Sequence, residues 1–209
     1  MGVDLKGLFT PDPCVQRKTD ELLFVKKKKK KKGVHNLLEA MPAVLKKHPT
    51  VRLMLAGSGP MEQKLRQQAQ RLQISDRVAF LGMVSQKKLP EMYRTATLAV
   101  FPFVIAKSGD QEGFGLVQVE AMGCECPIIA GDLPAIHDIV IHEENGLIVE
   151  SGNIRALADA IIQTLDDKDL RLKLAEKARM QVMERFDWEV IAGKYGKIYQ
   201  ALLHSLIVK

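Results

Sequence analysis

The segment Val51-Arg-Leu-Met-Leu-Ala-Gly-Ser-Gly-Pro60 joins a short apolar run to a glycine-rich turn. Its first six residues are apolar except for Arg52, a composition typical of a strand buried inside a parallel sheet. The turn is followed by apolar residues at the spacing of one helix face, namely Met61, Leu65, Ala69 and Leu72. The segment therefore predicts a strand that leads through a tight turn into a helix.

The same alternation extends in both directions along the chain. Apolar runs predict further strands at Leu22–Val25, Val78–Leu81, Leu98–Phe101, Pro127–Ala130 and Leu147–Val149. Helical spacing predicts helices at 34–45, 86–96, 154–165, 170–186 and 188–206, and one more that carries Glu120. This alternation indicates right-handed βαβ units. We therefore expect a doubly wound, Rossmann-like α/β fold: one domain over residues 1–209, with a parallel sheet of about six strands and C-terminal helices.

In an open sheet of this kind, ligands bind outside the carboxyl ends of the strands. The loops after Val25, Ala56, Leu81 and Phe101 should therefore form the site. Gly57, in the turn after the second strand, could bring its backbone close to a phosphate, although such a glycine turn occurs in many folds.

The positive charge of the chain is concentrated in one place. Seven of the 31 lysines and arginines form the run Lys26–Lys32, which leaves 24 basic residues against 25 acidic ones. Only 5% of the residues are aromatic, and no basic stripe with interleaved aromatics appears elsewhere. We therefore do not expect nucleic acid as a partner.

Other residue types exclude further classes of site. The three cysteines, Cys14, Cys124 and Cys126, have no CxxC spacing and are expected to be reduced thiols. The histidines show no HExxH spacing, so we expect no metal. No apolar run is long enough to span a bilayer, and the first residues lack a signal-peptide pattern. We expect a cytoplasmic location, with the inner face of the membrane as an open alternative.

The segment Glu112-Gly-Phe-Gly-Leu-Val-Gln-Val-Glu120 combines two glycines with two acidic residues at the start of a predicted helix. The glycines allow a ligand close to the backbone, and the N–H groups of the first turn favour a phosphate. Glu120, one to two turns into the helix, could accept both hydroxyls of a ribose. The alternative is that both carboxylates lie there only because the positive end of the helix dipole stabilises acidic residues, and that they bind no ligand.

This segment, continued by Ala-Met-Gly-Cys-Glu-Cys-Pro127, resembles the Glu-x7-Glu segment of the retaining glycosyltransferases called glycosyl transferases group 1, or family four. Further landmarks of that family occur in the same order along nearly the whole chain. They are Gly2-Val-Asp4 with Phe9, Leu22–Val25 with Lys32-Gly-Val34, Leu55–Pro60, Phe80-Leu-Gly82 and Asn145–Val149. Several ordered landmarks are far more specific than any single one.

The resemblance implies one half of a two-domain GT-B fold, in which the C-terminal domain binds the nucleotide-sugar donor. It implies that Glu120 binds the ribose diol and that Glu112 contacts the donor sugar. The backbone of Phe114, Gly115 and Leu116 would hold the sugar or phosphates, and Val84 would read the base. The implied reaction transfers a hexose from a UDP- or GDP-sugar to a hydroxyl acceptor with retention and without a metal or other cofactor, for cell-surface polysaccharide or glycolipid.

The lysine run lies where the family carries a Gly and an Arg after its first strand and a Lys before the next Gly. Lys26 and Lys27 occupy the first two of these positions, and Lys32 matches the third. Positive groups here would stabilise the departing diphosphate, so we expect catalytic roles for Lys27 and Lys32. Lys27 keeps the charge but lacks the planar fork of an arginine. The run itself can be an altered stretch, a natural variant, or a tether to nucleic acid or membrane.

The chain resembles the C-terminal domain of such an enzyme, so its expected partners are a UDP- or GDP-sugar and the family's N-terminal acceptor domain. Helix 188–206 is expected to pack toward that domain, and the full enzyme could associate peripherally with a membrane. Without the acceptor half, we expect weak binding of UDP or GDP and no transfer. Two alternatives stay open: a nucleotide-binding module without transfer activity, and a basic tether through Lys26–Lys32.

Overall fold

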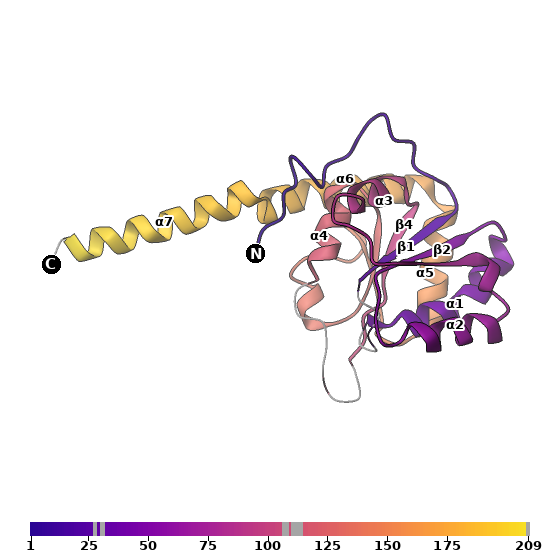
Figure 1. Cartoon of the computed structure of the whole chain (residues 1–209). Helices are drawn as coiled ribbons and strands as arrows, with labels where there is room; N and C mark the ends of the chain where they lie inside the picture. The colour runs from indigo at the N-terminus through magenta and orange to yellow at the C-terminus, as the bar shows by residue number, and fades with distance from the viewer. Residues whose placement is uncertain (27–28, 30–31, 106–108, 110–114, 208–209) are drawn as a thin grey trace.

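The computed structural model describes residues 1–26, 29, 32–105, 109 and 115–207. Six strands form one sheet, with helices on both of its faces (Figure 1). The strands are β1 (Glu21–Val25), β2 (Arg52–Ala56), β3 (Val78–Gly82), β4 (Leu98–Phe101), β5 (Ile128–Gly131) and β6 (Leu147–Val149). The helices are α1 (Val34–Lys47), α2 (Glu62–Arg71), α3 (Leu89–Thr95), α4 (Leu116–Gly123), α5 (Ile154–Asp166), α6 (Lys168–Phe186) and α7 (Trp188–Ile207).

The sheet is parallel throughout, with the strand order β3-β2-β1-β4-β5-β6. From β1 the chain proceeds outward to β2 and β3, and from β4 it proceeds outward in the opposite direction to β5 and β6. These two strands pair at the centre, where Leu22 lies opposite Leu98 and Leu23 opposite Ala99. The direction of winding reverses between them, so the carboxyl ends of β1 and β4 form the topological switch point at which such sheets bind ligands.

Helix contacts define the two outer layers. On one face α1 packs against α2 and α5, and on the other α4 packs against α3 and α6. The central strands are covered on both faces, and every residue of β4 is buried. This explains why the strands read as continuous apolar runs rather than as alternating patterns.

Two backbone segments approach each other closely at the switch point. Gly33, the residue before α1, has a φ of 68°, and a β-carbon there would lie 1.6 Å from the carbonyl oxygen of Pro102. The loop after β1 therefore contacts the loop after β4 backbone to backbone. Only glycine fits this contact, because it combines a left-handed φ with the absence of a side chain.

The predicted doubly wound sheet of six strands is confirmed, and each strand lies within about one residue of its expected bounds. The helix predicted at 86–96 is shorter, because α3 begins at Leu89 and ends at Thr95. Pro90 falls in its first turn, where a missing N–H is tolerated, and the preceding residues form a turn closed by Lys88 and Ser85.

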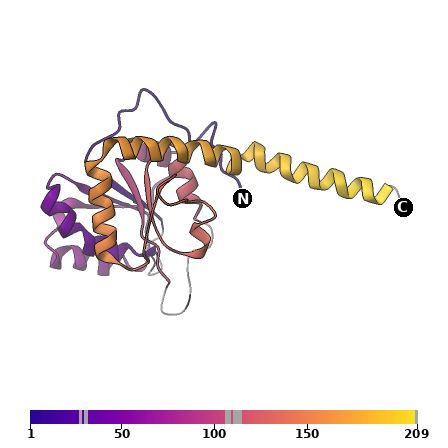
Figure 2. The same ribbon diagram turned by 180° about the vertical axis from the view of Figure 1, so that it is seen from behind.

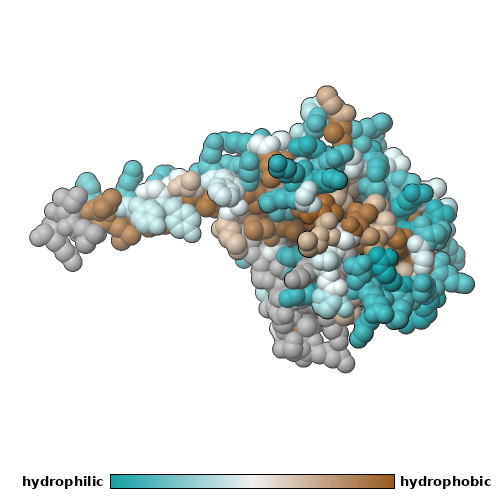
Figure 3. Space-filling view, in the orientation of Figure 1, coloured by the Kyte–Doolittle hydropathy of each residue, from teal (hydrophilic) through white to brown (hydrophobic). Residues whose placement is uncertain are grey.

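The last helix, α7, projects away from the rest of the molecule in both views (Figures 1 and 2). Apolar residues are visible on its surface (Figure 3). Its exposed large side chains are Trp188, Tyr195, Ile198, Tyr199, Leu202 and Leu203. That this helix packs toward another domain stays a prediction. Within the described residues, no helix has both the length and the apolar character needed to cross a membrane.

Candidate functional site

A groove of about 360 Å³ lies at the carboxyl ends of β1, β2 and β3. Its lining comes from the ends of these strands and from the segment before α3: Val25, Lys26, Ala56, Gly57, Ser58, Met83, Val84 and Leu89. Gly57 and Val84, both predicted from the sequence, line this groove. The Gly57 N–H donates to the carbonyl oxygen of Gly82 at 2.6 Å, which holds the turns after β2 and β3 together.

The wall after β3 is apolar. Met83 is 84% exposed, whereas Val84 is half-buried and packs against the core. Leu89 at the start of α3 continues the apolar wall toward the sheet. An apolar surface beside the backbone at the strand ends suits a flat, partly polar ligand such as a nucleobase.

Two lysine ammonium groups lie near the switch point. Lys26 Nζ is 5.6 Å from the ring centroid of Phe103, and Lys32 Nζ is 5.2 Å from the same centroid. Lys32 is only 5% exposed, although it belongs to a run of seven lysines. The aromatic face stabilises both cations, and burial strengthens their interaction with a nearby anion. The site therefore presents positive charge between the loops after β1 and β4.

Helix α4 directs its N-terminus toward the same edge. Gly115 precedes the helix with a φ of 60°, and Leu116 is the first helical residue. Gly115 has no side chain with which to cap the first turn, so ligand oxygens are suitable acceptors for its N–H groups. A residue with a β-carbon would be strained here.

Glu120 lies in the second turn of α4, half-buried, with its Oε2 atom 3.3 Å from the hydroxyl of Tyr93. Burial raises the pKa of Glu120 above its ordinary value, while the Tyr93 hydrogen bond and the positive charge of Lys26 act in the opposite direction. The influence of Lys26 links α4 to the loop after β1. The carboxylate is therefore part of the positively charged switch-point region.

The expected site residues fall into two groups, those that the structure places and those outside its described residues. The structure brings Gly57, Val84, Lys32, Gly115, Leu116 and Glu120 to the carboxyl edge of the sheet. Glu112, Phe114 and Lys27 lie outside the described residues, so their expected roles stay predictions.

Sequence reasoning missed Tyr93 and Phe103. Both are fully buried, and each contacts a charged side chain of the site. Tyr93 carried one weak signal, because the hydroxyl of a tyrosine that is buried in a predicted helix needs a hydrogen-bond partner. Phe103 follows β4 by two residues and is indistinguishable in sequence from a core residue.

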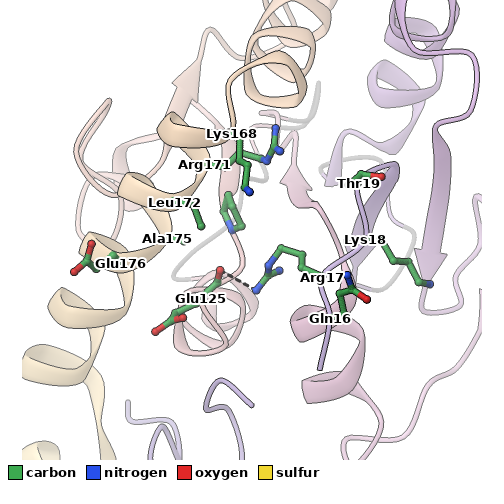
Figure 4. Close-up of a pocket in the computed structure, with 11 residues that line it drawn as sticks. Gln16, Arg17, Lys18, Thr19, Glu125, Lys168, Arg171, Leu172, Ala175 and Glu176 are labelled. Atoms are coloured by element: carbon green, nitrogen blue, oxygen red, sulfur yellow. Dashed lines mark hydrogen bonds between the residues drawn. The ribbon is translucent and has the colours of Figure 1, made fainter. Parts of the chain in front are cut away.

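A larger cavity, of about 650 Å³, lies at the opposite edge of the sheet. Thr19 precedes β1 and Glu125 precedes β5, so this cavity opens at the amino ends of the strands (Figure 4). Its two arginines already bind main-chain oxygens: Arg17 those of Tyr93, Ala96, Cys124 and Glu125, and Arg171 those of Thr164 and Leu165. These arginines hold the domain together, so the cavity is a weaker candidate than the smaller groove.

In the part of the chain that the structure describes, no three or more His, Cys, Asp or Glu side chains gather closely enough to hold a metal ion. The expectation of a reaction without a metal stays a prediction. Cys124 and Cys126 are buried free thiols, and burial raises the pKa of Cys124 to about 12.

Comparison with known proteins gives consistent results. The model of the family described as glycosyl transferases group 1 matches residues 14–181. An uncharacterized glycosyltransferase of Methanocaldococcus jannaschii is 30% identical over 92% of this chain and 47% of its own length. A GDP-mannose-dependent alpha-(1-6)-phosphatidylinositol monomannoside mannosyltransferase of Mycobacterium tuberculosis is 30% identical over 78% of this chain and 43% of its own length.

A solved structure extends the comparison to three dimensions. The Anabaena protein HepE, in complex with UDP-glucose, is similar with a TM-score of 0.81 and 25% sequence identity, over 96% of this chain and 56% of that chain. The chain thus spans about half the length of the relatives it matches. The matched segment includes all six strands and the switch-point loops, and from this agreement of sequence and fold we conclude that the chain belongs to the glycosyl transferases group 1 family.

Proposed function

We propose that this chain is the donor-binding part of a retaining glycosyltransferase that transfers a hexose from a UDP- or GDP-sugar to a hydroxyl acceptor. The observation that carries the proposal is that the ammonium groups of Lys26 and Lys32 lie over the ring of Phe103 at the carboxyl edge of the sheet, where Lys26 also lowers the pKa of Glu120. A nucleotide diphosphate needs a carboxylate for its ribose hydroxyls and positive charge for its phosphates, and both kinds of group meet here.

The groove beside Gly57 and Val84 would receive the base, because it combines an apolar wall with backbone groups at the ends of β2 and β3. Lys32, together with the N-terminus of α4, would hold the diphosphate. As the bond to the sugar breaks, negative charge grows on the departing diphosphate, and these fixed positive groups would stabilise it. We propose the same role for Lys27, and contact with the donor sugar for Glu112, Phe114 and the backbone of Gly115 and Leu116.

The relatives support both nucleotides as donors. HepE was solved with UDP-glucose, and the mycobacterial mannosyltransferase is named for GDP-mannose. The latter acts on a glycolipid, which supports a role in cell-surface glycolipid or polysaccharide synthesis, at the inner face of the membrane. The reaction would also require the family's N-terminal acceptor domain, toward which we expect α7 to pack.

Isothermal titration calorimetry of the 209-residue chain with UDP, GDP and ADP tests the donor assignment. We expect binding of UDP or GDP that is weakened about tenfold or more by Glu120→Ala, since hydrogen bonds to a charged group contribute about 1.5–3 kcal/mol. Glu184→Ala, at an exposed position of α6, is the matched control and should leave the affinity unchanged. Absence of binding by all three nucleotides would refute the proposal.

A further inference from the structure

Tyr93 is a fully buried tyrosine on α3 whose hydroxyl meets a carboxylate of the proposed donor site. Its exposed fraction is 0%, and its hydroxyl donates to Oε2 of Glu120 at 3.3 Å. A buried hydroxyl needs a partner, and a charged carboxylate is among the strongest acceptors available to it. The contact therefore joins α3 to α4 below the carboxyl edge of the sheet.

The position of Tyr93 is fixed at both ends of the residue. Its ring packs against that of Phe9, with centroids 6.2 Å apart and planes tilted by 58°. Its carbonyl oxygen accepts a hydrogen bond of 2.9 Å from Arg17, which also binds the carbonyl oxygen of Ala96 at the end of α3. The hydroxyl can therefore move little relative to α4.

A tyrosine held in this way restricts Glu120. The carboxylate could otherwise rotate about its terminal bond and present either oxygen to a ligand. With Oε2 bound to Tyr93, the Oε1 atom is left as the acceptor for ligand hydroxyls. The same hydrogen bond lowers the pKa of Glu120, against the effect of burial, and so favours the ionised form that accepts ribose hydroxyls.

From this geometry we infer that Tyr93 is a positioning residue for nucleotide recognition: it orients Glu120 and keeps it ready to accept the hydroxyls of a ribose. The inference rests on the proposed function, because it assigns a ribose to Glu120. It predicts that the chain distinguishes ribonucleotides from nucleotides that lack the ribose hydroxyls, and that this distinction depends on the Tyr93 hydroxyl.

The surroundings of the pair are compatible with this role. Burial and the neighbouring carboxylate raise the pKa of Tyr93 well above its ordinary value, so the hydroxyl stays a donor throughout the physiological range. Cys124 and Cys126 also face Tyr93, and burial raises the pKa of both thiols, which keeps them neutral. Among the residues that the structure describes, Lys26 is the positive group that lowers the pKa of Glu120.

The first experiment needs no nucleotide. The pKa of Glu120 is measured by NMR titration of side-chain carboxyl carbons in the wild-type chain and in Tyr93→Phe, with Tyr195→Phe on the exposed face of α7 as the matched control. We expect Tyr93→Phe to raise the pKa of Glu120 and Tyr195→Phe to leave it unchanged. An unchanged pKa in Tyr93→Phe would overturn the inference, and thermal unfolding verifies that this near-isosteric variant is folded.

The second experiment compares UDP or GDP, whichever binds more tightly, with its 2′,3′-dideoxy analogue. We expect Tyr93→Phe to weaken binding of the ribonucleotide about tenfold and to leave binding of the dideoxy analogue unchanged. An equal loss for both ligands would show a merely structural effect and overturn the inference. If Glu120→Ala weakens ribonucleotide binding but Tyr93→Phe does not, the inference fails alone; if Glu120→Ala has no effect, the proposed function fails as well, whatever the NMR titration gives.

Discussion

Glu120 is subject to opposing influences on its pKa, and the balance has consequences for stability as well as for binding. Burial raises the pKa above the ordinary 4.5, while Tyr93 and Lys26 lower it. The net shift is upward, so the folded chain holds this proton more tightly than the unfolded chain. The ionised carboxylate therefore lowers the stability of the fold above its folded-state pKa, and this penalty disappears as the pH falls below the ordinary value.

Glu120→Gln tests this balance. Because the amide has no charge to bury, we expect the variant to be more stable than the wild type at neutral pH and equally stable below about pH 4. We also expect the affinity of the wild type for UDP or GDP to fall as the pH is lowered through the raised pKa of Glu120. The variant has no carboxylate to protonate at this position, so its affinity should not fall at that pH.

Urea denaturation and calorimetry over the same pH range give both quantities. The comparison with the variant also separates protonation of Glu120 from protonation of the nucleotide phosphate. A variant that is less stable than the wild type at neutral pH would contradict the assigned direction.

Lys32 is the second residue whose environment points to a specific task. A nearly buried ammonium over the Phe103 ring should act on the diphosphate rather than on the nucleoside. We expect Lys32→Met to weaken binding of UDP or GDP about tenfold or more, as for the loss of a charge-assisted hydrogen bond, and to leave binding of the nucleoside unchanged.

Lys64→Met, at an exposed position of α2, is the control and should leave both affinities unchanged. Calorimetry with the nucleoside diphosphate and with the nucleoside distinguishes the two contributions. An equal loss of affinity for both ligands would show that Lys32 does not act on the diphosphate.

At the scale of elements, the loops after β1 and β4 are held together by the backbone contact at Gly33. We expect Gly33→Ala to destabilise the fold by about 3 kcal/mol or more, because it adds a steric clash with Pro102 to the strain of a left-handed φ. Gly82 has nearly the same φ, 67°, but a β-carbon there meets no atom within 4 Å.

Gly82→Ala is therefore the matched control, and we expect it to cost only about 1–2 kcal/mol, the strain alone. Urea denaturation of both variants measures the difference. Equal destabilisation would show that the backbone contact at the switch point contributes nothing.

The elements were largely predictable because buried strands and amphipathic helices have distinct periodicities. Leu98–Phe101 and Leu147–Val149 have the bounds expected from the sequence. The start of α3 was misplaced, because Gln86 to Lys88 have no apolar pattern and the turn that they help to form depends on local hydrogen bonds. The partners of Glu120 were not predictable, since Tyr93 reaches α4 only through the packing of α3 beside it.

At the scale of the whole molecule, the charged groups at the two edges of the sheet have different surroundings. At the amino edge, the guanidinium groups of Arg17 and Arg171 are hydrogen-bonded to main-chain oxygens. At the carboxyl edge, Lys26, Lys32 and Glu120 lie around Phe103, β1 and α4. The volume of a cavity is therefore a poorer guide to the site here than the arrangement of these charges.

The central claim is that a nucleotide binds at the carboxyl edge, and amide chemical-shift mapping on addition of UDP or GDP tests it most directly. We expect the largest shifts at Lys26, Gly57, Val84 and Gly115, and none beyond background at Lys168 and Arg171 in the larger cavity. Shifts concentrated at Lys168 and Arg171, with Gly57 and Val84 unaffected, would contradict the account.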